Sequence, residues 1–313
     1  MSINQFKHIL VIKHGSLGDI AFSLLAMASI KKKFINSRID LVTEKKFQKF
    51  LNKSNYFENI ITDNRSGILE SFKIIIKIKQ NNYDLIIDLQ NSKRTNLYWL
   101  FLKLISKIKI NGSRSNCDFQ YIIPPQGSES PQRGLYNQLK LLGVNEISHN
   151  IEWLSSNIEY IQSDKLILII PSVSKSGKNK QWSPYQFGKL SRSLEDIGYR
   201  ICIVGQDSDR ETMNVIINSC KKVIDLTGKS PPEIIYSVAK KSSLIISNDT
   251  GPGHIAALSQ MPILFLGIDN VVSKSNLSAY KNGYQILTES MDSLSFERVM
   301  EFLNEKNLIA KCN

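Results

Sequence analysis

Short runs of aliphatic, often β-branched residues recur along this chain, and each is followed by a stretch whose apolar residues have helical spacing. The clearest runs are His8–Ile12, Leu166–Ile170, Arg200–Gly205 and Ser243–Ser247. Continuous apolar runs of this length are typical of strands buried on both faces of a parallel sheet, and their alternation with helices favours βαβ units. We therefore expect an α/β fold of doubly wound parallel sheets.

The strand–helix pattern is interrupted once and then restarts. Pro124–Pro131 is the strongest loop signal in the sequence, and a helix expected over 134–142 follows it. A chain of 313 residues has room for about two domains. We predict an α/β domain over 1–155 and a second over 156–313, with the last helix, about 293–310, as a candidate to pack back on the first domain.

Positive charge is concentrated in the first half of the chain. Residues 1–150 hold 22 Lys and Arg against 11 Asp and Glu, whereas residues 151–313 hold 18 against 17, within a formal net charge of +12. Such a basic region is typical of proteins that meet nucleic acid, an anionic membrane surface or a phosphorylated substrate. A lysine-rich composition without any partner would give the same asymmetry, so charge alone leaves the function open.

The sequence disfavours several classes of protein. Cys117, Cys202, Cys220 and Cys312 form no C-x-x-C pair and have no histidine at ligand spacing, which disfavours a disulfide framework and a structural zinc site. The first residues lack the pattern of a secretory signal, and no apolar run reaches the roughly 18–20 residues that span a bilayer. We expect a soluble protein or one peripheral to a membrane.

The loop after the first expected strand, Lys13–Asp19, contains Gly15, Gly18 and Asp19. Ligands of open α/β sheets bind at the carboxyl ends of strands, where a helix N-terminus also attracts phosphate. The G-x-x-G-D spacing does not match the G-x-G-x-x-G dinucleotide fingerprint. Asp19 is therefore either a side chain at the mouth of a ligand site or an acid of the first helical turn favoured by the helix dipole.

The segment Ser247–Ala257 is the more specific motif. A buried strand ends at Asn248 or Asp249, and a glycine-rich turn leads into a helix of small residues. This arrangement is typical of a nest of amides and hydroxyls for a diphosphate, with Thr250 and His254 as additional donors. The alternative is an ordinary strand-to-helix turn capped by an aspartate.

Two further loops contain candidate ligand-binding groups. In Lys178–Trp182, Lys178 or Lys180 would place a cation beside developing phosphate charge, and Trp182 would anchor the loop; a solvated lysine-rich loop is the alternative. The carboxylates of Gly205–Glu211 follow a strand, where acids often bind ribose hydroxyls, although they could equally cap the next helix.

The segment Tyr98–Lys109 interleaves apolar and cationic residues. This pattern is typical of a helix that lies on a membrane surface. A helix that faces the core and keeps its lysines in water would show the same pattern.

Taken together, these motifs resemble glycosyltransferase family 9, the ADP-heptose:lipopolysaccharide heptosyltransferases. The matching segments follow the family's order over most of the chain: Ile12–Asp19, Tyr83–Gln90, Lys180–Trp182, Asp225–Lys229 and Leu244–Ala257, with Pro262 after the last. Asn91 stands where the family usually has glycine, and the loop Pro171–Lys180 is longer and more basic than is common.

The resemblance implies the GT-B fold, in which two Rossmann-like domains face each other across a cleft, the first for the acceptor and the second for the nucleotide sugar. It implies an inverting, metal-independent enzyme without a cofactor that moves heptose from ADP-heptose to a lipid A–Kdo acceptor or a growing lipopolysaccharide core. The implied partners are the nucleotide sugar, this phosphorylated acceptor and the anionic inner-membrane leaflet, without nucleic acid. The implied location is the cytoplasm, peripheral at the inner membrane.

The resemblance also gives roles to single residues. Asp19 matches the general base that takes the proton of the acceptor hydroxyl, and Lys180 matches the cation that stabilises the departing ADP. Lys93 and Arg94 are the expected acceptor-binding residues, and no metal ligand is expected. The expected nucleotide-sugar-binding residues are Ser16, Ser172, Asp207, Asp249, Thr250, Gly251, Gly253 and His254.

Two other functions remain open from the sequence. One is a family member that uses another nucleotide sugar to build a different surface glycan. The other is a non-catalytic protein that binds nucleic acid or an anionic membrane, suggested by the charge alone. The sequence lacks a recognisable nucleic-acid-binding motif, and the presence of Asp19, Lys180 and His254 disfavours a degenerate binder.

Overall fold

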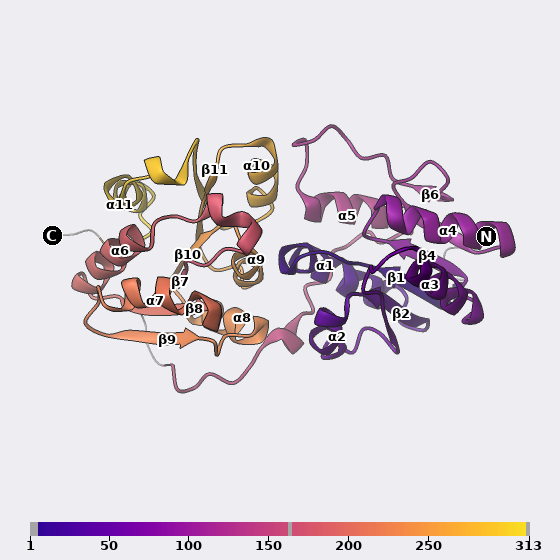
Figure 1. The fold of residues 1–313 in the computed structure, drawn as a ribbon, viewed down its shortest axis with the longest axis horizontal. Helices are drawn as coiled ribbons and strands as arrows, with labels where there is room; N and C mark the ends of the chain where they lie inside the picture. Colours follow the sequence, from indigo (N-terminus) through magenta and orange to yellow (C-terminus); the bar gives the residue numbers. More distant parts are fainter. Residues whose placement is uncertain (1–5, 162–164, 311–313) are drawn as a thin grey trace. The chain divides into compact units, whose positions relative to one another are not determined.

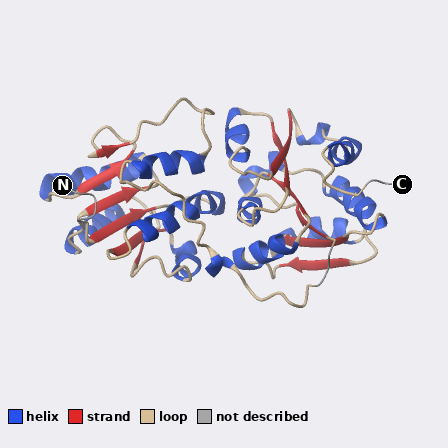
Figure 2. Ribbon diagram, turned by 180° about the vertical axis from the view of Figure 1, so that it is seen from behind, coloured by secondary structure: helices blue, strands red, loops and turns tan. Residues whose placement is uncertain are grey.

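The computed structural model describes residues 6–161 and 165–310, and the chain divides into two compact units, Met1–Trp153 and Leu154–Asn313 (Figure 1). Each unit contains one six-stranded sheet in which all paired strands are parallel. Helices lie on both sides of each sheet (Figure 2). The expected α/β fold of doubly wound parallel sheets is therefore confirmed.

The sheet of the first unit has the strand order β3-β2-β1-β4-β5-β6. Its strands are β1 (His8–Ile12), β2 (Arg38–Thr43), β3 (Ile60–Thr62), β4 (Leu85–Asp88), β5 (Lys109–Gly112) and β6 (Phe119–Gln120). Its helices are α1 (Leu17–Lys33), α2 (Lys45–Asn52), α3 (Ile68–Gln80), α4 (Lys93–Ile105) and α5 (Pro131–Lys140). The order reverses between β1 and β4, which is the usual ligand-binding point of a Rossmann-like sheet.

The second unit repeats this arrangement, with the strand order β12-β11-β10-β7-β8-β9. Its strands are β7 (Leu166–Ile170), β8 (Arg200–Gly205), β9 (Val223–Thr227), β10 (Leu244–Asn248), β11 (Ile263–Ile268) and β12 (Gly283–Thr288). Its α-helices are α6 (Pro184–Asp196), α7 (Arg210–Ile217), α8 (Pro232–Lys241), α9 (Gly251–Ala257), α10 (Val271–Leu277) and α11 (Phe296–Glu305). The order reverses between β7 and β10, so the two sheets have equivalent reversal points.

Each unit has its own apolar core. In the first unit, strand residues such as Leu10 and Ile86 are fully buried against Trp99 of α4. In the second unit, Ile169 and Ile246 lie in a cluster that also contains Val299 and Leu303 of α11, and α11 packs against α6. The last helix therefore contributes to the core of the second unit.

The main differences from the sequence prediction are short or polar elements. β3 has three residues and β6 two, too few to show a period, and β12 (Gly283–Thr288) carries polar residues between its apolar ones. Most helices expected from apolar spacing are present, and their ends differ from the predicted ones by a few residues. The differences arise because a sequence pattern determines the ends of a helix less well than its existence. Across the described ranges, no helix is both long enough and apolar enough to cross a membrane.

Candidate active site

The sequence-predicted catalytic and diphosphate-binding residues lie in loops that follow the strands at the two reversal points. The loop after β1 carries Ser16 and leads into α1, whose first turn holds Asp19, and the segment after β7 carries Ser172 and Lys180. The loop after β10 carries Asp249 and Thr250 and leads into α9. Because parallel strands end at the same edge of a sheet, each unit gathers its candidate residues at the position where such folds bind ligands.

Asp19 lies in the first turn of α1 and closes a capping box with Ser16. The Ser16 backbone N–H and hydroxyl both donate to Asp19 Oδ2, at 2.7 Å each, and the Asp19 N–H donates to Ser16 Oγ at 3.3 Å. Gly15 has a φ of 117°, and a side chain there would collide with the Asp19 carboxylate. The helix-cap interpretation is therefore confirmed for Oδ2, while Oδ1 accepts no hydrogen bond from the residues that the structure describes.

Two titratable groups, an amine and a carboxyl, are buried near this loop. Burial lowers the pKa of the Lys13 amine against the opposing effect of Asp19 and Asp88, and its Nζ donates to the Leu89 carbonyl at 3.3 Å. Burial raises the pKa of the Asp88 carboxyl, although Asp88 accepts hydrogen bonds from the backbone N–H groups of Gln90 and Asn91. Lys13 thus places a buried amine close enough to Asp19 for the two to interact electrostatically.

The structure explains how asparagine is accommodated at position 91, where the family usually has glycine. Its φ is 53°, in the left-handed region that favours glycine and that asparagine tolerates better than most residues. Its side-chain amide donates to Gln138 at 2.8 Å and accepts from the Ser113 N–H at 2.7 Å. Asparagine therefore keeps the backbone turn of a glycine and adds hydrogen bonds that tie this loop to its neighbours.

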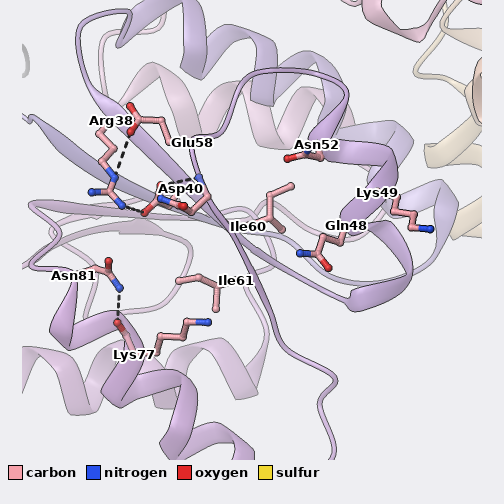
Figure 3. A pocket seen from close by; sticks show the side chains of 11 residues that line it. Arg38, Asp40, Gln48, Lys49, Asn52, Glu58, Ile60, Ile61, Lys77 and Asn81 are labelled. Atoms are coloured by element: carbon pink, nitrogen blue, oxygen red, sulfur yellow. Dashed lines mark hydrogen bonds and ion pairs between the residues drawn. The ribbon is translucent and has the colours of Figure 1, made fainter.

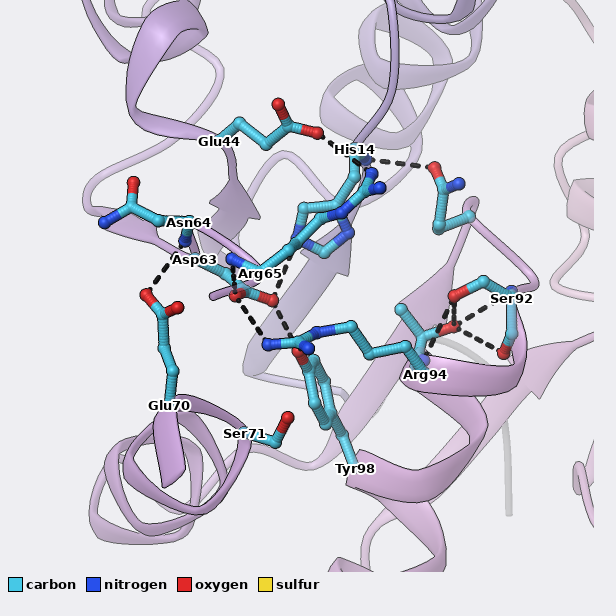
Figure 4. A network of polar contacts seen from close by, with 12 residues as sticks. His14, Glu44, Asp63, Asn64, Arg65, Glu70, Ser71, Ser92, Arg94 and Tyr98 are labelled. Carbon is cyan, nitrogen blue, oxygen red and sulfur yellow. Dashed lines mark hydrogen bonds and ion pairs between the residues drawn. The ribbon is translucent and has the colours of Figure 1, made fainter. Parts of the chain in front are cut away.

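A second group of residues near the Asp19 loop, which we call the Asp63 cluster, contains Asp63, His14, Arg94 and Tyr98 (Figure 4). Asp63 directly follows β3 and is fully buried. His14 Nε2 lies 3.3 Å from Asp63 Oδ2, Arg94 Nη2 lies 3.2 Å from Oδ1, and the Tyr98 hydroxyl donates to Oδ2. Burial alone would raise the pKa of Asp63, but the nearby His14 and the hydrogen bonds from Tyr98 and the Arg65 N–H hold it well below its usual range.

The Asp63 cluster changes how the predicted acceptor residues are interpreted. Arg94 Nε also donates to the Tyr98 hydroxyl, so two of its three nitrogens are used inside the protein, and its side chain is 25% exposed. Lys93, the first residue of α4, is exposed. Sequence reasoning missed Asp63, His14 and Tyr98 as partners because they come from separate segments, and no spacing rule links them.

In the second unit, a group that we call the Asp249 cluster contains Asp249, Lys180, His254 and Ser273. Lys180 Nζ lies 2.8 Å from Asp249 Oδ2, His254 Nε2 lies 3.2 Å from Oδ1, and the Ser273 hydroxyl donates to Oδ2 at 3.4 Å. Burial alone would raise the pKa of Asp249, but the bonds from His254 and Lys180 outweigh it and lower the pKa to about 2. Asp249 is therefore an ionised carboxylate that orients two donors.

The cluster distinguishes the two lysines that the sequence left as alternatives. Lys180 contacts Asp249, whereas Lys178 is exposed in the short 3₁₀ segment Lys175–Lys180. Trp182 anchors this loop as expected: it is fully buried, its N–H donates to Asn248 Oδ1 at 3.1 Å, and its Nε1 donates to the Leu294 carbonyl at 2.8 Å.

Tyr280 is a further member of this region that sequence reasoning missed. Its hydroxyl lies 3.0 Å from His254 Nδ1, and burial raises its pKa well above the usual value. A Tyr280 hydroxyl that donates to Nδ1 leaves the hydrogen of His254 on Nε2, where it faces Asp249. Sequence reasoning could not predict this contact, because His254 and Tyr280 come from separate segments and a single sequence does not show whether their spacing is conserved.

The remaining predicted nucleotide-sugar residues differ in their surroundings. Ser172 is buried after β7, and its hydroxyl has no hydrogen-bond partner among the described residues. Thr250 is the N-cap of α9, and its side chain makes no capping bond. Gly251 begins α9, whereas a side chain at Gly253 would collide with Ser247 and Phe265, so packing alone requires glycine there.

The two aspartates after β8 differ in their surroundings. Asp209 accepts from the Gln206 N–H at 3.1 Å and forms a capping box, as an ordinary helix cap would. Asp207 is 84% exposed and lies so close to Gly228 that a side chain at position 228 would collide with it. Asp207 therefore stands at the edge of the sheet next to the turn after β9, with its carboxylate open to solvent.

A hollow of about 630 Å³ lies elsewhere in the first unit, at the edge of the sheet beside β2 and β3 (Figure 3). Its lining includes Arg38, Asp40, Lys49 and Lys77. Arg38 is the first residue of β2, so this hollow extends towards the amino ends of the strands. The Asp40 carboxylate already accepts from the Tyr83 hydroxyl at 2.8 Å and from Asn59. None of the predicted site residues lines this hollow.

The chain was compared with known proteins. The family model of glycosyltransferase family 9 (heptosyltransferase) matches residues 71–268. Among curated proteins, lipooligosaccharide heptosyltransferase 2 of Haemophilus ducreyi is 21% identical over 350 residues, covering 95% of this chain and 98% of that protein. Lipopolysaccharide heptosyltransferase 3 of Escherichia coli K12 is 22% identical over 279 residues, covering 80% of this chain and 79% of that protein.

Solved structures agree in fold. The E. coli heptosyltransferase WaaC, solved with ADP-2-deoxy-2-fluoro heptose, has a TM-score of 0.74 at 17% identity, covering 96% of this chain and 99% of that chain. A family 9 glycosyltransferase from Veillonella parvula has a TM-score of 0.71 at 21% identity, covering 99% and 92%. The fold is GT-B, as expected. The protein is a glycosyltransferase enzyme, and it belongs to glycosyltransferase family 9, the heptosyltransferase family.

Proposed function

We propose that this protein transfers heptose from ADP-heptose to the inner core of lipopolysaccharide, either a lipid A–Kdo acceptor or a growing core. The curated relatives are named as lipopolysaccharide or lipooligosaccharide heptosyltransferases, and WaaC was solved with a fluorinated ADP-heptose. Its membership of the family makes the protein an enzyme rather than the non-catalytic binder suggested by charge alone. The observation that carries the proposal is the Asp249 cluster, which places a cation and a histidine at the reversal point of a Rossmann-like sheet.

In the proposed reaction, the acceptor hydroxyl attacks the anomeric carbon of the heptose while Asp19 takes its proton. The bond from that carbon to the ADP oxygen breaks, and ADP leaves with the electron pair on the opposite face, which inverts the anomeric configuration. The two Ser16 hydrogen bonds fix the Asp19 side chain through Oδ2 and leave Oδ1 to accept the proton. The sheet edge after β1 is thus suited to hold the general base.

We assign the diphosphate to the second unit. Lys180 has three N–H donors and uses one on Asp249, so the others can meet the negative charge that grows on the leaving ADP. Ser172, Thr250, Gly251 and His254 would contribute further donors around the diphosphate, and Asp207 would accept from the ribose hydroxyls. Asp249, being anionic, acts in this proposal as the residue that positions Lys180 and His254.

We assign the acceptor to the first unit. Lys93 is exposed at the start of α4, and Arg94 keeps Nη1 outside its bonds to Asp63 and Tyr98. Cations at this sheet edge suit the phosphate and carboxylate groups of a lipopolysaccharide core. The acceptor would be embedded in a bilayer, so we also propose peripheral contact with the cytoplasmic face of the inner membrane.

The proposal is tested with a panel of nucleotide sugars and lipopolysaccharide acceptors of defined length, with ADP or other nucleotide release as the readout. We expect ADP-heptose to give the highest turnover and EDTA to leave the turnover unchanged. Faster reaction with a different nucleotide sugar would establish the alternative of another surface glycan. Loss of activity in EDTA that a divalent cation restores would overturn the metal-independent mechanism.

A further inference from the structure

Two neighbouring helices of the first unit expose an unusual amount of apolar surface. α3 and α4 pack against each other (Figure 1). Eight of the eighteen exposed large hydrophobic side chains among the described residues lie on these two helices: Ile68, Leu69, Phe72 and Ile76 on α3, and Leu97, Phe101, Leu104 and Ile105 on α4. We call these eight residues the α3–α4 surface. The most exposed are Leu69 at 79% and Leu104 at 81%.

The α3–α4 surface is a continuous face rather than a scatter of single residues. On each helix the exposed apolar residues recur at helical spacing, as in Ile68, Phe72 and Ile76, and lie apart from the residues buried against the sheet. The two rows meet where the rings of Phe72 and Phe101 pack edge to face, with centroids 5.7 Å apart. Monomeric proteins rarely leave such a contiguous apolar face in water, so we expect it to have a partner.

The charged residues of these two helices are mostly basic, although Lys103 forms an ion pair with Asp118. Glu70 is the sole acid within the sequences of α3 and α4, and it accepts from the Asn64 and Ser66 backbone N–H groups. The basic residues of the same two helices are Lys73, Lys77, Lys79, Lys93, Arg94 and Lys103. Exposed aliphatic and aromatic side chains mixed with lysines are the combination that binds the headgroup region of an anionic bilayer.

We propose that the α3–α4 surface is the face with which the protein docks on an anionic lipid bilayer, its apolar side chains entering the headgroup region and its lysines lying among the lipid phosphates. This inference specifies the membrane contact of the proposed function and rests on it. A second copy of the chain fits less well, because a two-fold contact sets the same face against itself and brings lysines against lysines.

The test measures binding of the full chain to vesicles of phosphatidylethanolamine with phosphatidylglycerol, and to vesicles of phosphatidylcholine alone. The variant is Leu69→Glu with Leu104→Glu. Its control, Ile35→Glu with Val215→Glu, changes the charge equally at exposed aliphatic positions outside the surface. We expect the wild type to bind the anionic vesicles, the surface variant to bind at least about tenfold more weakly, and the control to bind as the wild type does.

Three results would overturn the inference: equal vesicle binding by the surface variant and the wild type, equal binding to neutral and anionic vesicles, or a wild-type dimer that the surface variant dissociates. ADP binding and transfer to a deacylated, water-soluble acceptor are measured in parallel on the same proteins. If these persist while vesicle binding does not depend on Leu69 and Leu104, the docking surface is wrong and the transferase proposal stands. If the wild type shows no transfer while its vesicle binding depends on Leu69 and Leu104, the transferase proposal is wrong and the docking surface stands.

Discussion

The Asp63 cluster and the Asp249 cluster contain the same types of residue but differ in their position in the sheet and in how many donors of the cation are bonded within the protein. In each, a buried aspartate after a strand contacts one histidine and one cation. Asp63 follows the edge strand β3, and its Arg94 directs two nitrogens to other members of the cluster. Asp249 follows β10 at the sheet's reversal point, and its Lys180 is 33% exposed with one of three donors used. We infer that the first cluster chiefly holds loops in place and the second chiefly serves a ligand.

The loop that contains His14 of the Asp63 cluster leads into α1, where Asp19 is the residue with the largest expected effect on turnover. Replacing Asp19 by Asn removes the proposed base but keeps a hydrogen-bond acceptor for Ser16. We expect kcat to fall about 10³-fold with ADP binding unchanged, since general bases contribute roughly 10²–10⁴-fold. The control is Glu58→Gln, which neutralises an exposed carboxylate of the same unit. Near-normal turnover of Asp19→Asn would disprove the assignment.

Lys180 and Lys178 separate the role of the Asp249 cluster from that of the loop's overall charge. Lys180→Ala removes the cation that contacts Asp249, and Lys178→Ala removes an exposed cation two residues away. We expect Lys180→Ala to lower kcat about 10²-fold through weaker stabilisation of the leaving ADP, and Lys178→Ala to change it less than about threefold. Steady-state kinetics with ADP-heptose check this, and equal losses in the two variants would contradict it.

Asp63→Asn and Asp249→Asn test the comparison between the clusters directly. For Asp63→Asn we expect a loss of unfolding free energy of about 2–4 kcal/mol, because Arg94 and His14 would face a neutral, partly mismatched amide in a buried position. For Asp249→Asn we expect at least about a tenfold loss of kcat, since Lys180 loses its orienting charge. Denaturant unfolding and kinetics on both variants check this. If the two variants shift stability and kcat alike, the distinction fails.

Acid should destabilise the protein through both carboxylates. The folded-state pKa of Asp63 and Asp249 is lowered, to about 2 for Asp249, so the unfolded chain takes up these protons first as the pH falls. Their contribution is fully present above about pH 4 and is lost as the pH falls towards 2. We expect Asp249→Asn to reduce the loss of unfolding free energy over this range by on the order of 2 kcal/mol. Parallel pH curves for variant and wild type would contradict this.

The sequence predicted the architecture well where burial gives a clear pattern. β7 and β10 are fully buried and read as continuous apolar runs, so their existence and parallel pairing could be expected. The Asp249 cluster was largely foreseeable because two of its members, Asp249 and His254, share one loop and helix.

The Asp63 cluster and the contact of Tyr280 with His254 could not be foreseen. Asp63 follows a strand of three residues, and its partners come from the loop after β1 and from α4. The sequence showed the exposed apolar residues of α4 only as an ambiguous pattern in Tyr98–Lys109, because one helix can both face the core and lie on a membrane, and it gave no prediction for the exposed face of α3. In α4, Tyr98 and Trp99 are fully buried, while Leu104 is 81% exposed.

The most direct test of the central claim is the structure of the product formed from ADP-heptose and a defined lipopolysaccharide inner-core acceptor. We predict that the purified protein adds one heptose to the acceptor, releases one ADP and gives a glycosidic bond of inverted anomeric configuration, as determined by mass spectrometry and NMR. An acceptor that stays unmodified while the protein binds ADP-heptose, or a product with retained configuration, would contradict the account.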